Sequence, residues 1–178
     1  QQVDRRITGL HRTYLRPTGD GKANVSSAKR MFGECFRGAV RLTAPAEHLT
    51  LTEGIETGWS ALAADNTRAV WVALSLGNLA GGGLGVGDPH PDRPGQHLPA
   101  TEPDMDRPGI VLPPIVRRVT IVRDSDNGDP ASGDALIRRA TSRFQRQGIA
   151  VSWATPPDGT DLNDIHAAPG GGASEVHA

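Results

Sequence analysis

The sequence has a single cysteine, Cys35, in 178 residues. One cysteine cannot form an intramolecular disulfide or supply the several thiolates of a cysteine-based zinc site. Long apolar runs are also missing, because the longest, 69–74, falls far short of the roughly 20 residues that cross a bilayer. No basic segment followed by an apolar stretch opens the chain, as a signal peptide would require. We therefore expect a soluble cytoplasmic protein with no membrane contact.

Glycine and proline are abundant, with 22 and 14 residues. This content predicts long irregular segments, and the range 81–108 shows no helical or strand periodicity. We expect this range to be a Gly/Pro-rich insertion and the most mobile part of the chain. The apolar content of 37% still suffices for one domain with a buried core.

Charge is distributed unevenly, although the net charge is only −1. Residues 1–46 hold nine basic and three acidic side chains, whereas residues 47–178 hold ten and 17. A basic front favours phosphate groups and an acidic remainder favours divalent cations. The alternative is that both are ordinary solvated surface.

Strand patterns alternate with helical ones after residue 47. In the basic lead-in, strands are expected at 10–15 and 39–42, with turn chemistry at 17–21. Further strands are expected at 49–52, 69–74, 119–122 and 149–154. This order predicts an α/β fold with a parallel sheet and a small β-rich lead-in.

Two helices are expected between these strands. The first places Ile55, Trp59 and Leu62 on one face, so we expect Trp59 to be buried, like Trp71. The second spans 133–147 and ends at Gly148. Its expected buried face is Leu136, Ala140 and Phe144, and its arginines are expected to point elsewhere: Arg138, Arg139, Arg143 and Arg146.

Acidic residues follow two of the expected strands. Glu53 comes after the strand at 49–52, and Asp124 and Asp126 come after the strand at 119–122. In parallel sheets ligands bind beyond the carboxyl ends of the strands, and carboxylates are hard ligands that suit Mg²⁺. The pattern therefore favours a site for one or two Mg²⁺ ions and a phosphate-bearing substrate. The alternative is that these acids are helix caps and turn residues.

Several short motifs, in this order, resemble the Toprim domain: LTLTEGIET (49–57), VTIVRDSD (119–126) and GTDLND (159–164). The lead-in segments GLHRTYL (9–15), GDGKA (19–23) and GAVRL (38–42) are similar to those of Toprim primases and primase–helicases of phages, plasmids and integrated mobile elements. The resemblance implies a compact α/β domain with a parallel sheet of about four strands. It divides the chain into a lead-in (1–46), a Toprim domain (47–168) and a flexible tail (169–178).

The resemblance also implies roles for the acids. Glu53 would be a metal ligand or a general base or acid, and Asp124 and Asp126 would hold Mg²⁺, with Mn²⁺ as a substitute. Two acids, Asp161 and Asp164, would form a further acidic element beside the site. The sequence departs from replicative primases at Thr57, where those enzymes carry an acid, and in a longer turn after Asp126. Two further candidate ligands are therefore Glu56 and Asp129.

A primase joins nucleotides by attack of a 3′-hydroxyl on an α-phosphate, with Mg²⁺ stabilising the charge that develops. The implied partners are a single-stranded DNA template and nucleoside triphosphates, with zinc-binding or helicase domains elsewhere in a longer protein. The candidate phosphate-binding residues are Lys22, Arg30, Arg37 and Arg41. The alternative functions are a Mg²⁺-dependent Toprim nuclease and a non-catalytic module that binds nucleotide or nucleic acid.

Overall fold

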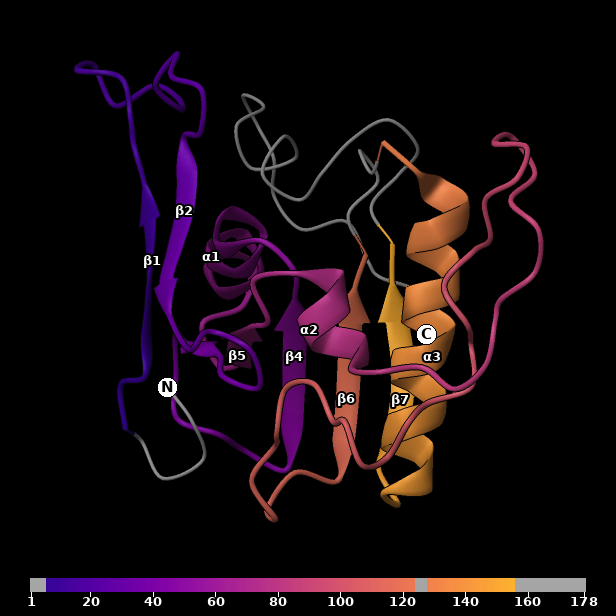
Figure 1. Ribbon diagram of the computed structural model, residues 1–178. Helices are drawn as coiled ribbons and strands as arrows, with labels where there is room; N and C mark the ends of the chain where they lie inside the picture. The colour runs from indigo at the N-terminus through magenta and orange to yellow at the C-terminus, as the bar shows by residue number, and fades with distance from the viewer. Residues whose placement is uncertain (1–5, 124–127, 156–178) are drawn as a thin grey trace.

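The computed structural model of the chain describes residues 6–123 and 128–155. A five-stranded sheet of order β3-β5-β4-β6-β7 forms the centre of this part (Figure 1). Its strands are β3 (Val40–Arg41), β4 (His48–Thr52), β5 (Ala69–Val72), β6 (Arg118–Val122) and β7 (Ala150–Ala154). The strands from β5 to β7 run parallel, and β3 is antiparallel to β5. The predicted α/β fold with a parallel sheet of about four strands is confirmed.

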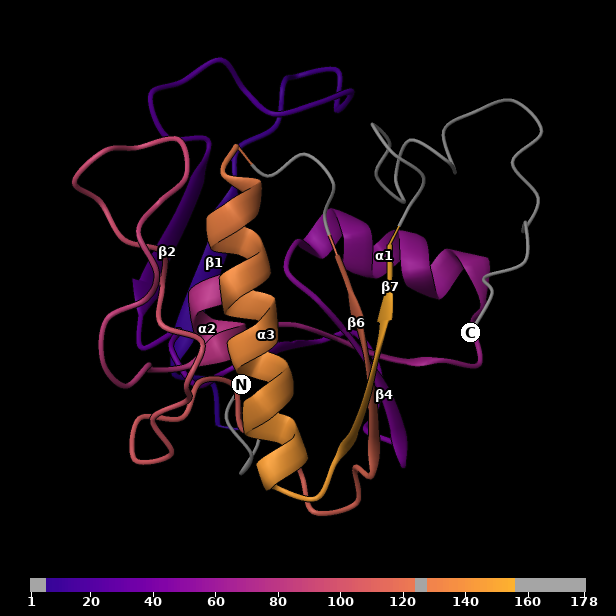
Figure 2. The same ribbon diagram turned by 90° about the vertical axis from the view of Figure 1, so that its right-hand side faces the viewer.

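Helices cover both faces of the sheet, which is why the central strands are apolar or threonine-rich. α1 (Ile55–Ala64) lies on one side, and α3 (Pro130–Arg146) lies on the other (Figure 2). The short helix α2 (Leu76–Ala80) packs on the α3 side. No helix in the described ranges is both long enough and apolar enough to span a bilayer.

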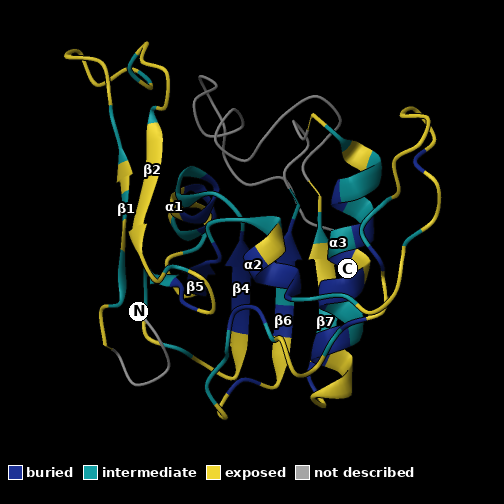
Figure 3. Ribbon diagram, in the orientation of Figure 1, coloured by how far each residue is buried: buried dark blue, intermediate teal, exposed yellow. Residues whose placement is uncertain are grey.

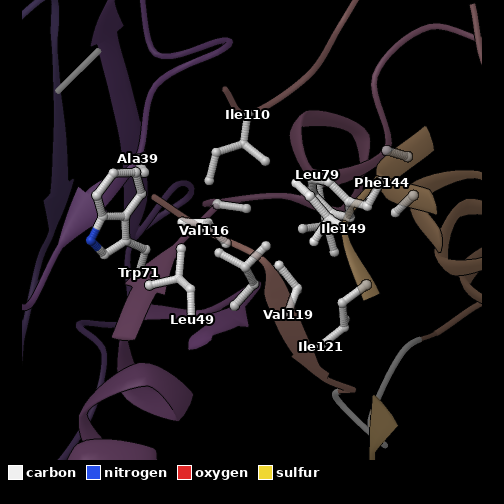
Figure 4. Packing of buried hydrophobic residues seen from close by; sticks show 14 of the residues in the cluster. Ala39, Leu49, Trp71, Leu79, Ile110, Val116, Val119, Ile121, Phe144 and Ile149 are labelled. Atoms are coloured by element: carbon white, nitrogen blue, oxygen red, sulfur yellow. The ribbon is translucent and has the colours of Figure 1, made fainter. Parts of the chain in front are cut away.

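The main core lies between the sheet and the helices α2 and α3 (Figure 4). Alternate strand residues such as Leu49 and Ile121 point to the same face and meet Phe144 of α3. Trp71 is fully buried in this cluster, as predicted, and its indole N–H donates to the Thr43 carbonyl at 3.1 Å. Its polar atom is thus satisfied inside the core.

The predicted inward face of α1 is wrong at Trp59, which is 55% exposed. The face that meets the sheet consists of smaller residues: Thr57, Gly58, Ser60 and Ala61. A Cβ atom on Gly58 would lie only 2.7 Å from Cγ2 of Val72, so the helix sits too close to the sheet for bulky side chains. The indole of Trp59 is therefore on the solvent side.

Helix α3 begins three residues before the predicted start, because Asp129 caps it and Pro130 is its first residue. The carboxylate of Asp129 accepts from the Ser132 N–H at 3.1 Å. Gly148 follows the helix with φ +76°, which confirms the predicted termination. The expected buried face is also confirmed at Ala140 and Phe144.

Two arginines of α3 do not point away from the core as predicted. Arg139 donates to the carbonyls of Ala100 and Gly81, at 2.5 and 2.9 Å. Arg143 donates to the carbonyls of Ile110 and Leu79, at 3.2 and 2.8 Å. Both arginines are buried, and burial lowers the pKa of Arg143 to about 10. They supply the donors that irregular backbone beside the core needs.

The segment 81–108 contains no helix or strand, which confirms its predicted irregularity. It runs beside α3 (Figure 1). Isolated β-bridges connect Gly83 with Pro103 and Pro89 with His97 within it. Arg139 donates to the Gly81 and Ala100 carbonyls of this segment, and its predicted mobility remains a prediction. α2, which precedes it, is too short to show helical periodicity in the sequence.

The lead-in forms an antiparallel hairpin of β1 (Gly9–Thr13) and β2 (Lys29–Gly33). The turn expected at 17–21 is present, with Gly19 at φ +76°. β2 was not expected from the sequence, and all five of its residues are exposed (Figure 3). The strand expected at 39–42 is β3, which is hydrogen-bonded to β5 of the main sheet. The domain boundary at 46/47 remains a prediction.

Replacing Arg143 by methionine should lower the free energy of unfolding by about 2 kcal/mol, because two buried carbonyls lose their donor. Chemical denaturation measures this. Arg138→Met, one position from Arg139 and exposed, should stay within about 0.5 kcal/mol of the wild type. Equal stability of the two variants would show that the buried guanidinium does not hold the adjacent backbone.

Candidate functional site

The carboxyl ends of β4 and β6 lie side by side at one edge of the sheet (Figure 1). Leu51 is paired with Ile121. Two positions further along the sequence, Glu53 directly follows β4 and Arg123 directly follows β6. Asp124 follows directly in the sequence. The strands that precede the two acidic motifs therefore end at the same edge, as the sequence predicts for a parallel sheet.

Glu53 is partly buried and stands between the end of β4 and the start of α1. Gly54 is the N-cap residue of α1, with extended backbone and no side chain to cap the helix. The hydroxyl of Thr52 donates to the Gly54 carbonyl at 3.0 Å, which fixes the turn that carries Glu53. The carboxylate is thus positioned by a tight strand-to-helix connection.

Glu56, one of the further candidate ligands, is engaged by a cation. The ammonium of Lys29 lies 3.1 Å from both carboxylate oxygens. Burial raises the pKa of Glu56, but its own backbone N–H and Lys29 outweigh that effect, so the pKa falls below its ordinary value. This ion pair joins α1 to the hairpin, and Glu56 has this structural partner in addition to its predicted role.

Four of the predicted acids, Asp124, Asp126, Asp161 and Asp164, lie outside the described residues. Arg123 is the last described residue before Asp124. Its guanidinium forms an ion pair with Asp134 of α3. Among residues 6–123 and 128–155, no three Asp, Glu, His or Cys side chains form a group that could hold a metal ion.

Asp129, the other further candidate ligand, already has several partners. Besides capping α3, it lies 3.1 Å from Nε2 of His90 and 2.9 Å from Nη1 of Arg93. Nδ1 of His90 accepts from the Asp92 N–H at 3.1 Å, so Nε2 of the neutral ring carries the proton and donates to Asp129. The carboxylate therefore attaches the segment 81–108 to the start of α3.

Lys22 and Arg30, two of the four predicted phosphate-binding residues, are exposed on the hairpin. Lys22 pairs with Leu15 near its turn, and Arg30 lies within β2. Arg41 is partly buried on β3, with its guanidinium carbon 4.4 Å from the centre of the Trp71 ring. These three residues are thus distributed over the hairpin and β3, the outermost strand of the main sheet.

Arg37, the fourth, borders an open depression of about 530 Å³ that sequence reasoning missed. Arg37 has φ +66°, and its N–H donates to Oδ1 of Asn78 at 2.7 Å. The lining comes from three separate parts of the chain: Phe36, Arg37, Gly77, Gly81, Gly82, Asp106, Arg107 and Pro108. Because these parts are brought together only by folding, no local pattern in the sequence marks the depression.

Comparison with known families gives two matches. Residues 109–172 match the family described as Toprim domain, and residues 1–42 match a domain of unknown function (DUF7146). The Toprim match contains Asp124, Asp126, Asp161 and Asp164 but begins after Glu53. No curated protein and no solved structure matches the chain.

Toprim domains generally bind Mg²⁺, and the described part of the edge is compatible with that ion. Glu53, which follows β4, carries the hard carboxylate group that Mg²⁺ prefers, and β4 is paired with β6. The nearby cationic groups of Lys29 and Arg123 are both engaged by other carboxylates, those of Glu56 and Asp134. They are thus held in place by those ion pairs.

Asp129 should make the free energy of unfolding depend on pH in the acidic range. The pKa of Asp129 is lowered to about 2, mainly by the hydrogen bond from the Ser132 N–H. Burial opposes this effect, and the Ser132 hydroxyl, His90 and Arg93 add to it. Since the unfolded pKa is about 3.9, this contribution is complete above pH 4 and is lost as the pH falls toward 2. Asp129→Asn should therefore be less stable than wild type at pH 7 and should lose less stability on acidification.

Melting temperatures between pH 7 and pH 2 test this expectation. Asp88→Asn is the control. Asp88 is an exposed aspartate of the segment 81–108 and caps no described helix, so this variant should follow the wild-type curve. Parallel curves for wild type and Asp129→Asn would show that the Asp129 carboxylate is not preferentially stabilised in the folded protein.

Proposed function

The chain carries a Toprim domain, and from this premise we propose that it catalyses Mg²⁺-dependent nucleotidyl transfer in DNA priming. Toprim domains are usually catalytic and act in nucleic-acid chemistry. The finer assignment, a primase of mobile-element type, is supported by the order of the lead-in and Toprim motifs along the sequence. Its substrates would be nucleoside triphosphates and a single-stranded DNA template.

The observation that carries the proposal is the parallel pairing of β4 with β6. This pairing brings the strand that ends before Glu53 next to the strand that leads into Asp124 and Asp126. Carboxylates that are distant in sequence can then serve one phosphate-bearing substrate. A pair of helix caps would need no such adjacency, because each cap serves only its own helix.

Glu53, Asp124 and Asp126 would hold the ion, and the described turn at Thr52–Gly54 would orient Glu53. Bound Mg²⁺ supplies charge stabilisation at the transferring phosphoryl group and lowers the pKa of the attacking hydroxyl. Glu53 could accept that proton, since its carboxylate sits on a rigid connection at the edge. Lys22 and Arg30, on the hairpin, would contribute contacts to phosphates.

Glu53→Gln keeps the size of the side chain and removes its charge. We expect it to reduce Mg²⁺-dependent dinucleotide synthesis about 100-fold or more, as loss of a metal ligand or general base does. Glu47→Gln is the matched control, because Glu47 lies just before β4 at the opposite end of the same strand. It should retain wild-type activity.

Labelled ribonucleotides on single-stranded DNA distinguish the reactions. Primers support the proposal, whereas cleaved template identifies a nuclease and unchanged template a binding module. The assay should include this chain and any longer native protein that contains it, because a Toprim domain can depend on flanking domains. Primer synthesis that is unaffected by Glu53→Gln would refute the assigned role of Glu53.

Metal binding is tested separately by calorimetric titration with Mn²⁺. Asp124→Ala and Asp126→Ala should each weaken binding sharply, because carboxylates supply most of the ligands. Asp20→Ala, an exposed aspartate in the hairpin turn, should bind Mn²⁺ like the wild type. Unchanged titration heats in both site variants, with the fold intact, would exclude these two residues as ligands.

A further inference from the structure

The hairpin has an inner and an outer face that differ in chemistry. The pairs Thr13–Lys29 and His11–Met31 share one face, and Lys29 reaches Glu56 of α1 from it. This face is therefore the inner one. The opposite face, here called the outer face, carries Leu10, Arg12, Tyr14, Arg30 and Phe32. Its orientation is fixed because the inner face is attached to α1.

Apolar and aromatic groups on the outer face are open to solvent. Leu10 and Phe32 are directly opposite each other and are 61% and 44% exposed. Two strands alone do not bury enough surface to be stable without support. The exposed Leu10–Phe32 pair is therefore available for contact with a ligand.

The guanidinium group of Arg12 lies over the two aromatic rings of this face. The guanidinium carbon of Arg12 lies 4.4 Å from the centre of the Tyr14 ring and 5.2 Å from that of Phe32. Arg12 also donates a hydrogen bond to the Tyr14 hydroxyl. The two rings and the guanidinium thus form one cluster, and unpaired bases stack on aromatic and guanidinium groups of this kind.

Like charges face each other at the centre of the outer face. Arg12 and Arg30 are paired in register across the two strands, an arrangement that repulsion makes unfavourable. Neither has a carboxylate within ion-pair distance among the described residues, and neither hairpin segment, 10–14 or 28–32, contains an acid. An anion that bridges the two guanidinium groups would remove this repulsion.

We propose that the outer face of the hairpin binds single-stranded nucleic acid, with unpaired bases on Phe32 and Tyr14 and phosphates on Arg12 and Arg30. The charge and the stacking surface together fit this ligand better than a protein, which would supply carboxylates but no series of planar groups. The distal turn of the hairpin lies on the same side of the molecule as the carboxyl ends of β4 and β6 (Figure 1). The inference rests on the proposed function only in taking nucleic acid as the ligand.

The test is fluorescence anisotropy with an end-labelled oligothymidylate of about 20 nucleotides, in EDTA so that no metal-dependent reaction occurs. Phe32→Leu keeps an apolar contact with Leu10 and removes the ring. It should weaken binding about tenfold, since stacking on one aromatic side chain contributes about that much. Met31→Leu, the neighbour on the inner face, should change the dissociation constant less than about twofold.

Charge is tested by the double variant Arg12→Gln with Arg30→Gln. It should reduce the slope of log affinity against log salt by roughly 1.4, because two single-strand phosphate contacts are lost. The control is Arg118→Gln with Arg138→Gln, two exposed arginines of the main domain. It should leave the slope unchanged, and circular dichroism should show the same fold for all variants.

Equal binding by Phe32→Leu, Met31→Leu and the wild type would overturn the inference. So would a change in oligomeric state on Phe32→Leu without a change in oligonucleotide binding, because the face would then contact a second copy of the chain. An RNA oligonucleotide of the same length distinguishes the two kinds of single strand. Binding is measured without turnover, so loss of activity in Glu53→Gln and loss of binding in Phe32→Leu are independent results.

Discussion

Irregular backbone beside a core must find hydrogen-bond partners, and in this protein the guanidinium groups of α3 provide them. Arg139 and Arg143 reach from a regular helix to four backbone carbonyls of the segments that flank and include 81–108. Asn78 acts similarly from α2, with Nδ2 donating to the carbonyls of Gly38 and Ala73. The lead-in, the sheet and the insertion are thereby joined by buried side-chain donors, and the edge that carries Glu53 is built on this frame.

The parallel sheet could be predicted from the sequence because strand signals are local. The run at 49–52 and the run at 119–122 show their strand character in a few consecutive residues, and each is followed by acid. The arginines of α3 could not be placed, since arginine is usually exposed and only the folded chain shows which carbonyls lack donors. Trp59 was misplaced for a related reason: helical spacing identifies a face, but the closeness of Gly58 to Val72 decides which face meets the sheet.

The candidate site shows the same division between local and tertiary information. The ends of β4 and β6 lie side by side, so the placement of Glu53 near the end of the strand that precedes Asp124 could be expected from a parallel sheet. The partners of Glu56 and Asp129 could not, because Lys29 and His90 come from other parts of the chain. Those contacts give two acids structural roles, joining α1 to the hairpin and α3 to the insertion. The predicted catalytic or metal-binding roles of these two acids, like those of the acids after the strand ends, stay predictions.

The location of the metal is the central claim, and paramagnetic broadening by Mn²⁺ in NMR spectra tests it most directly. At substoichiometric Mn²⁺, the amide signals of Gly54 and Arg123 should broaden first, since they border the edge formed by β4 and β6. Signals from two aspartates of the insertion, Asp104 and Asp106, should remain sharp at the same concentration. Broadening centred on those two residues, or spread evenly over the protein, would contradict a metal site at the carboxyl ends of the strands.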